Sequence, residues 1–60
     1  YSNQGTTPLY LQEAASNYEE AGQLARAREL YERIQEEYPD SPQAEQVAIH
    51  LARLEARAQN

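Results

Sequence analysis

Residues 8–41 read PLYLQEAASNYEEAGQLARARELYERIQEEYPDS, and this stretch decides the fold. Small and apolar residues recur at helical spacing in its first part, at Leu11, Ala14, Ala15, Tyr18 and Ala21. A second stripe advances in alternating steps of three and four, through Leu24, Ala27, Tyr31, Ile34 and Tyr38. Such steps are typical of a narrow seam between packed helices. We therefore expect one helix over residues 8–21 and another over residues 24–38.

Start and stop signals flank these stripes. Thr7 and Ser41 each stand directly before a proline, which is the pattern of an N-cap hydroxyl followed by proline at the first helical position. Gly22 allows the first helix to end, and Pro39 ends the second. A third helix should begin after Ser41 and run to about residue 58. Its stripe is formed by Ala44, Val47, Ala48, Leu51, Leu54 and Ala58. Because the connections are short, neighbouring helices should pack antiparallel.

The spacing of these residues resembles that of the tetratricopeptide repeat, a helical hairpin of about 34 residues. The matching residues are Leu11, Ala14, Ala15, Tyr18, Gly22, Ala27, Tyr31 and Pro39. Three positions depart from the family pattern, because Leu11 replaces a frequent Trp, Ala15 replaces Gly, and Ile34 replaces Ala. The resemblance implies an all-α, antiparallel three-helix fold. In it, one repeat over residues 8–41 precedes a helix over 42–58, which is helix A of a following repeat or a capping helix. A simple three-helix bundle is the alternative.

Length, composition and charge limit the function classes. Sixty residues form one small domain at most, and a chain this short is marginally stable alone. It begins at Tyr1 and contains no Met, which favours an excised fragment of a longer protein or a processed chain. The net charge of -5 argues against nucleic-acid or anionic membrane partners, and no apolar run approaches the roughly 20 residues of a membrane span. Residues 1–7 are expected to be a flexible tail, and 59–60 a frayed end.

No set of side chains in the sequence predicts catalysis. His50 is the one histidine, and no carboxylate stands four residues from it to form a metal-ligand pair. Glu19 and Glu20 are sequence neighbours that point in different directions on a helix, so we expect solvated side chains rather than a catalytic pair. We therefore predict that the chain is not an enzyme and that it has no catalytic, cofactor-binding or metal-binding residues.

In tetratricopeptide proteins, helix A of each repeat lines a concave surface that binds extended peptides or other protein elements. Carried over by position, the resemblance implies that six polar residues form this surface: Gln12, Ser16, Glu19, Gln46, His50 and Arg53. We call these six residues the groove face. The resemblance also assigns Leu9, Glu20, Gln43 and Leu54 to the concave surface. The predicted function is a non-catalytic protein-interaction or scaffold module, and the alternative is a structural self-association element of a larger protein.

One face of the third helix has no partner in the predicted fold, since a further helix would normally cover it. We expect this face to pair with a second copy, most simply as a two-fold dimer. The candidate interface residues are Leu30, Val47, Ile49 and Leu54. Residues 38–44 also resemble repeats of bacterial cell-envelope proteins, which slightly favours the periplasm or cell envelope over the cytoplasm as the location.

Overall fold

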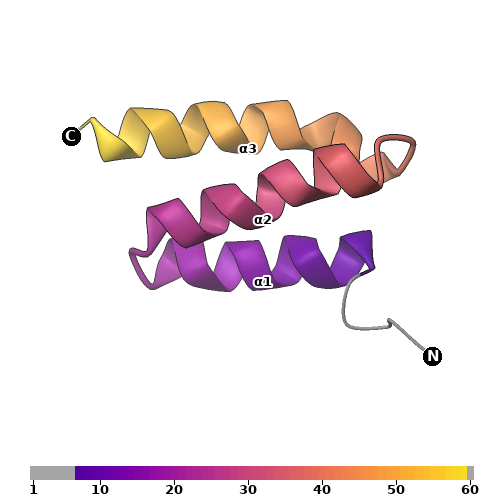
Figure 1. The fold of residues 1–60 in the computed structure, drawn as a ribbon. Helices are drawn as coiled ribbons and strands as arrows, with labels where there is room; N and C mark the ends of the chain where they lie inside the picture. Colours follow the sequence, from indigo (N-terminus) through magenta and orange to yellow (C-terminus); the bar gives the residue numbers. More distant parts are fainter. Residues whose placement is uncertain (1–6, 60) are drawn as a thin grey trace.

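The computed structural model describes residues 7–59. This part of the chain forms three helices, α1 (Pro8–Glu20), α2 (Leu24–Glu37) and α3 (Pro42–Ala58), as Figure 1 shows. The all-α prediction is therefore confirmed, and the first two helices each end one residue earlier than expected. The predicted flexible tail (residues 1–7) and frayed end (residues 59–60) lie mostly outside the described residues, because these exclude residues 1–6 and 60. None of the three helices is long and apolar enough to cross a membrane.

The predicted caps form the helix ends. The Thr7 hydroxyl accepts a hydrogen bond from the Tyr10 amide over 3.3 Å, and the Ser41 hydroxyl accepts one from the Ala44 amide over 3.1 Å. Each bond satisfies one of the backbone donors that a helix start leaves unpaired. Gly22 reverses the chain between α1 and α2 with a φ of 83°, a left-handed conformation that a side chain disfavours.

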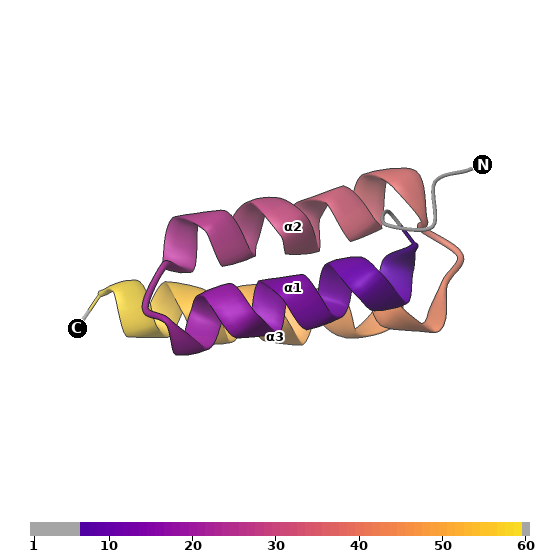
Figure 2. The ribbon, with the colours of Figure 1, turned by 90° about the horizontal axis from the view of Figure 1, so that it is seen from below.

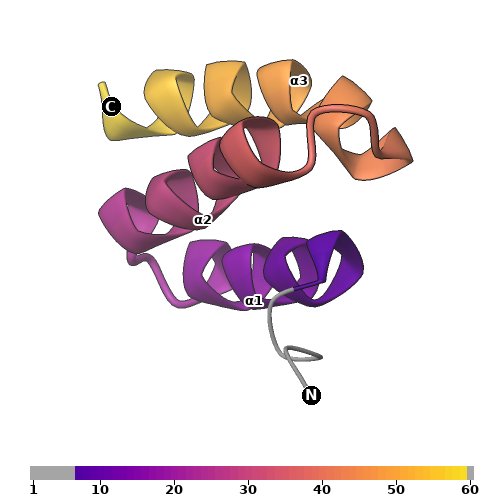
Figure 3. The ribbon, with the colours of Figure 1, turned by 45° about the vertical axis from the view of Figure 1, so that its right-hand side comes forward.

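The helices are arranged so that α1 and α3 run in the same direction and α2 runs back between them (Figure 1). Seen from below, α2 is displaced to one side, and α1 lies over α3 on the other (Figure 2). The oblique view in Figure 3 shows α2 inclined to both. Consequently α1 and α3 together present one face of the molecule, on the side away from α2.

All three helices contribute to one core. The buried apolar residues are Leu11, Ala15, Ala27, Tyr31, Ile34, Val47 and Leu54. Six further side chains pack around them: Tyr18, Leu24, Leu30, Tyr38, Ala44 and Leu51. Ala15 and Ala27 are fully buried. Their small side chains let α1 and α2 approach closely. Three alanines of the predicted stripes, Ala21, Ala48 and Ala58, are exposed instead, because they stand at the edges of their stripes or at helix ends.

Candidate functional site

A buried carboxylate joins the three helices where α1 meets α3. Glu19, near the end of α1, exposes only 7% of its surface. Arg53 of α3 donates two hydrogen bonds to its carboxylate, from Nε over 2.7 Å and from Nη2 over 2.8 Å. Arg57 donates a third from Nη1 over 3.1 Å, and the Tyr31 hydroxyl of α2 donates a longer one over 3.4 Å. The expectation that Glu19 is a solvated side chain is therefore wrong.

The helical period explains this burial. The buried positions of α1 are Leu11, Ala15 and Glu19, which follow one another at intervals of four residues. These positions lie on one side of α1, the side that contributes to the common core, and Glu19 at the end of this row reaches the arginines of α3. A buried carboxylate requires compensating hydrogen bonds and charge, and the two arginines of α3 supply both.

The charges in this cluster stabilise one another. The hydrogen bond from Arg53 is the main cause that lowers the pKa of Glu19 below 4.5, against a smaller opposing effect of burial. The same bond raises the pKa of Arg53. Burial, followed by the charge of Glu19, raises the pKa of the Tyr31 hydroxyl above 10. At neutral pH the cluster therefore holds one carboxylate, two guanidinium groups and a neutral phenol.

His50 extends the cluster along α3. Its ring stacks on that of Tyr31, with 4.6 Å between centroids and 11° between planes. Its Nδ1 lies 3.0 Å from Nη2 of Arg53. Burial, and then the charge of Arg53, lowers the pKa of His50 below 6.5. We call Glu19, Tyr31, His50, Arg53 and Arg57 the Glu19 network.

The other predicted groove residues lie toward the beginnings of α1 and α3. Gln12 and Gln46 line one shallow depression of about 230 Å³, together with Pro42 and Gln43. Ser16 is exposed, and it stands between Gln12 and Glu19 on the same side of α1. The structure thus brings Glu19, His50 and Arg53 into direct contact and puts Gln12 beside Gln46, while Ser16 contributes an open surface between the two groups.

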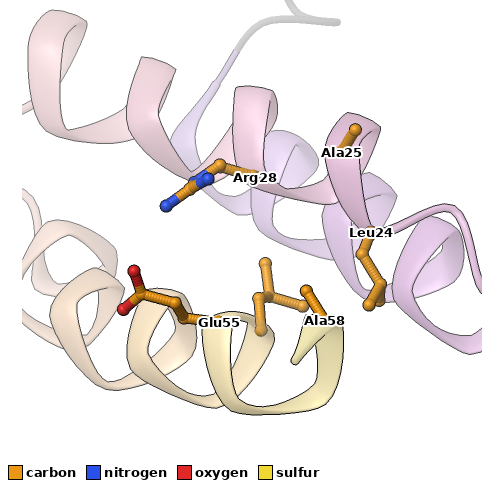
Figure 4. A pocket seen from close by; sticks show the side chains of 6 residues that line it. Leu24, Ala25, Arg28, Glu55 and Ala58 are labelled. Carbon is orange, nitrogen blue, oxygen red and sulfur yellow. The ribbon is translucent and has the colours of Figure 1, made fainter. Parts of the chain in front are cut away.

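A second depression, of about 190 Å³, lies between the start of α2 and the end of α3. Figure 4 shows Leu24 and Ala58 at one side of it and the charged ends of Arg28 and Glu55 at the other. Both depressions are smaller than the roughly 300–1,000 Å³ of typical small-molecule sites. Their size therefore fits the contact of single side chains better than the enclosure of an organic ligand.

Most of the residues predicted to form a self-association interface are buried or half-buried in the chain. Val47 and Leu54 are wrong as interface candidates, because both are buried in the core at 0% and 3% exposure. Leu30 is half-buried and packs against the same core. Ile49 is exposed to 67%, so it alone of the four offers a large apolar surface.

Sequence reasoning missed Arg57 and the role of Tyr31 in this site. Arg57 follows Arg53 by four residues, so both side chains lie on the same side of α3. That spacing indicates two cations on one side of α3, but it does not identify Glu19 as their partner, because α1 and α3 are not consecutive helices. Over residues 7–59 we find no group of three or more His, Cys, Asp or Glu side chains able to hold a metal.

Comparison with known proteins gives one family. The model of the tetratricopeptide repeat matches residues 10–41, which is more than half of the chain. Comparisons with curated proteins and with solved structures give no significant match.

Proposed function

Because the chain belongs to the tetratricopeptide repeat family, we propose that it is a non-catalytic protein-binding module whose contact surface is the groove face between α1 and α3. The observation that supports this most is the way Glu19 connects the two helices. Three hydrogen bonds from Arg53 and Arg57 hold α3 against α1. The pairing lies near the end of α1, so the surface toward the helix starts is left open.

The chemistry of the open surface suits a peptide backbone. Gln12 and Gln46 carry amide groups, each with donors and acceptors, and they border the same depression. Amides of this kind can bond the N–H and C=O groups of an extended segment irrespective of its side chains. Ser16, between them and the Glu19 network, leaves room because its side chain is small. We therefore propose an extended protein segment as the partner.

Selection from a library of random peptides tests this proposal. Peptides enriched on the 60-residue chain would be titrated into isotope-labelled protein, and backbone NMR shifts would be followed. We expect shifts to concentrate at Gln12, Ser16 and Gln46. Ser16→Arg fills the surface with a long side chain and should weaken binding at least tenfold. Gln35→Arg, at an exposed position of α2, should leave binding unchanged. Equal binding to both variants would refute the proposed surface.

Self-association is a second candidate, and one observation favours it. Ile49 is exposed to 67%, and Ala48 and Ala52 beside it are exposed as well, which gives α3 a small apolar outer face. We propose that a second copy covers this face. Sedimentation equilibrium should show a dimer that Ile49→Glu dissociates, while Leu9→Glu, at an exposed leucine of α1, leaves it intact. A monomer at every concentration would refute this candidate.

A cell-envelope location is also a proposal. It is supported by the resemblance of residues 38–44 to repeats of bacterial envelope proteins. Secretion of the parent chain into the periplasm, followed by fractionation, would test it.

A further inference from the structure

The surroundings of His50 define the protonation state of its ring. Nδ1 lies 3.0 Å from Nη2 of Arg53. A guanidinium group has donors and no acceptor, so Nδ1 must accept, and the neutral ring carries its proton on Nε2. Nε2 is buried, and among residues 7–59 it has no hydrogen-bond partner. One face of the ring rests on Tyr31. The contact of Nδ1 with Arg53 is therefore the one that requires a neutral imidazole.

A second ring proton conflicts with this arrangement. It would place an N–H on Nδ1 directly opposite a donor of Arg53, and it would add a positive charge beside an existing one. The charged and titratable groups around His50 are Glu19 from α1, Tyr31 from α2, and Arg53 and Arg57 from α3. Glu19 already accepts hydrogen bonds from both arginines and from Tyr31, so it is poorly placed to compensate a third cation.

We propose that His50 makes the groove face acid-sensitive, because protonation releases its ring from Tyr31 and Arg53 and turns it, charged, toward the solvent. The alternative is an imidazolium that keeps its place with the new Nδ1–H opposed to a donor of Arg53, and it costs more than exposure of a side chain that is only half-buried at the start. Glu19 keeps its bonds to Arg53 and Arg57, so the three helices stay together while the surface changes.

The change would occur in mild acid. Burial and the charge of Arg53 keep the pKa of His50 below 6.5, so the ring stays neutral at neutral pH and becomes charged only as the pH falls below that value. A partner bound at neutral pH would contact the His50 ring stacked on Tyr31, whereas in acid it would face the charged His50 side chain. That consequence for binding rests on the proposed function, whereas the release of the ring is a property of the free chain.

NMR titration of the free 60-residue chain tests the inference without any partner. We expect the His50 ring signals to report a pKa below 6.5, and the ring signals of Tyr31 and the Nε signal of Arg53 to change with the same midpoint. In Arg53→Gln, the pKa of His50 should rise. Arg33→Gln, which removes an exposed guanidinium on α2, should leave it unchanged.

Two results would overturn the inference. One is a His50 pKa at or above 6.5. The other is a titration of His50 during which the Tyr31 signals stay constant, because the ring would then remain stacked when charged. If Arg53→Gln proves unfolded, the nitrogen shifts of His50 in the unaltered chain still decide the matter, since a proton on Nδ1 at neutral pH would contradict the proposed contact. Failure to find a binding peptide would affect the proposed function alone.

Discussion

Arg53 and Glu19 stand 34 residues apart in the sequence, and two hydrogen bonds of 2.7 and 2.8 Å join their side chains across the boundary between α3 and α1. The carboxylate side is nearly buried, with 9% of its side chain exposed, whereas the Arg53 side chain keeps 43%. Because the Arg53 side chain is exposed, solvent screens and weakens its Coulombic attraction to Glu19. The hydrogen bonds matter more, because without them Glu19 would hold an undercompensated charge next to the core.

Removing Arg53 should therefore destabilise the fold more than removing a surface arginine. Arg53→Met keeps the apolar stem and deletes the charge, and we expect the free energy of unfolding to fall by about 1.5–3 kcal/mol, the range for hydrogen bonds to charged groups. Arg33→Met breaks only the exposed pair with Glu37, and it should cost about 0.5 kcal/mol or less. Urea unfolding followed by circular dichroism measures both. Equal costs would show that the Arg53 pair adds no more than a surface pair.

Stability should decrease on acidification in two steps. The folded-state pKa of His50 is lowered, so its contribution is present above 6.5 and is lost as the pH falls through the lower folded value. The folded-state pKa of Glu19 is lowered below 4.5, so its contribution is present above 4.5 and is lost as the pH falls further. Unfolding free energies measured across this range should show both. His50→Gln should abolish the first step, and Glu19→Gln should reduce the second; an unchanged profile in either variant contradicts that assignment.

Truncation of Ile34 should unfold much of the population. Its side chain is fully buried among all three helices, and replacing Ile by Ala in such a core costs about 2–5 kcal/mol. A domain of this size has little stability to lose. Helicity at 25 °C should therefore drop sharply in Ile34→Ala. The neighbouring substitution Gln35→Ala, at an exposed position, should preserve it. Full helicity and an unchanged melting temperature in Ile34→Ala would show that the core is not organised around this residue.

The turn between α1 and α2 offers a test of backbone strain alone. Gly22 has a φ of 83°, and a Cβ added there would meet no atom within 4 Å. Gly22→Ala should therefore cost about 1–2 kcal/mol through conformation and not through a clash. Gly22→Asn should cost less, because Asn adopts the left-handed region more readily. Thermal unfolding compares the two. If Ala proved as stable as Gly, the turn would have to adopt another conformation.

Local signals in the sequence were sufficient for the helices and their order. Thr7 and Ser41 act as caps, Gly22 reverses the chain, and α3 begins and ends at the predicted residues. These features depend on interactions within a few positions along the chain, which is why periodicity and capping residues reveal them. The same periodicity predicted that Ile34 and Val47 belong to apolar stripes, although it could not tell that Val47 faces inward rather than toward a second copy.

Only the tertiary structure decided which polar residues are buried. Glu19 reads as a solvated carboxylate on α1 alone, and Arg53 and Arg57 read as surface cations on α3. Their pairing depends on the relative position of two helices that are not consecutive, and no pattern within either helix encodes that distance. The sequence by itself determined three amphipathic helices joined by short turns. The packing of α3 against α1 decided that one carboxylate, two arginines and a stacked His50–Tyr31 pair would form the connected part of the groove face.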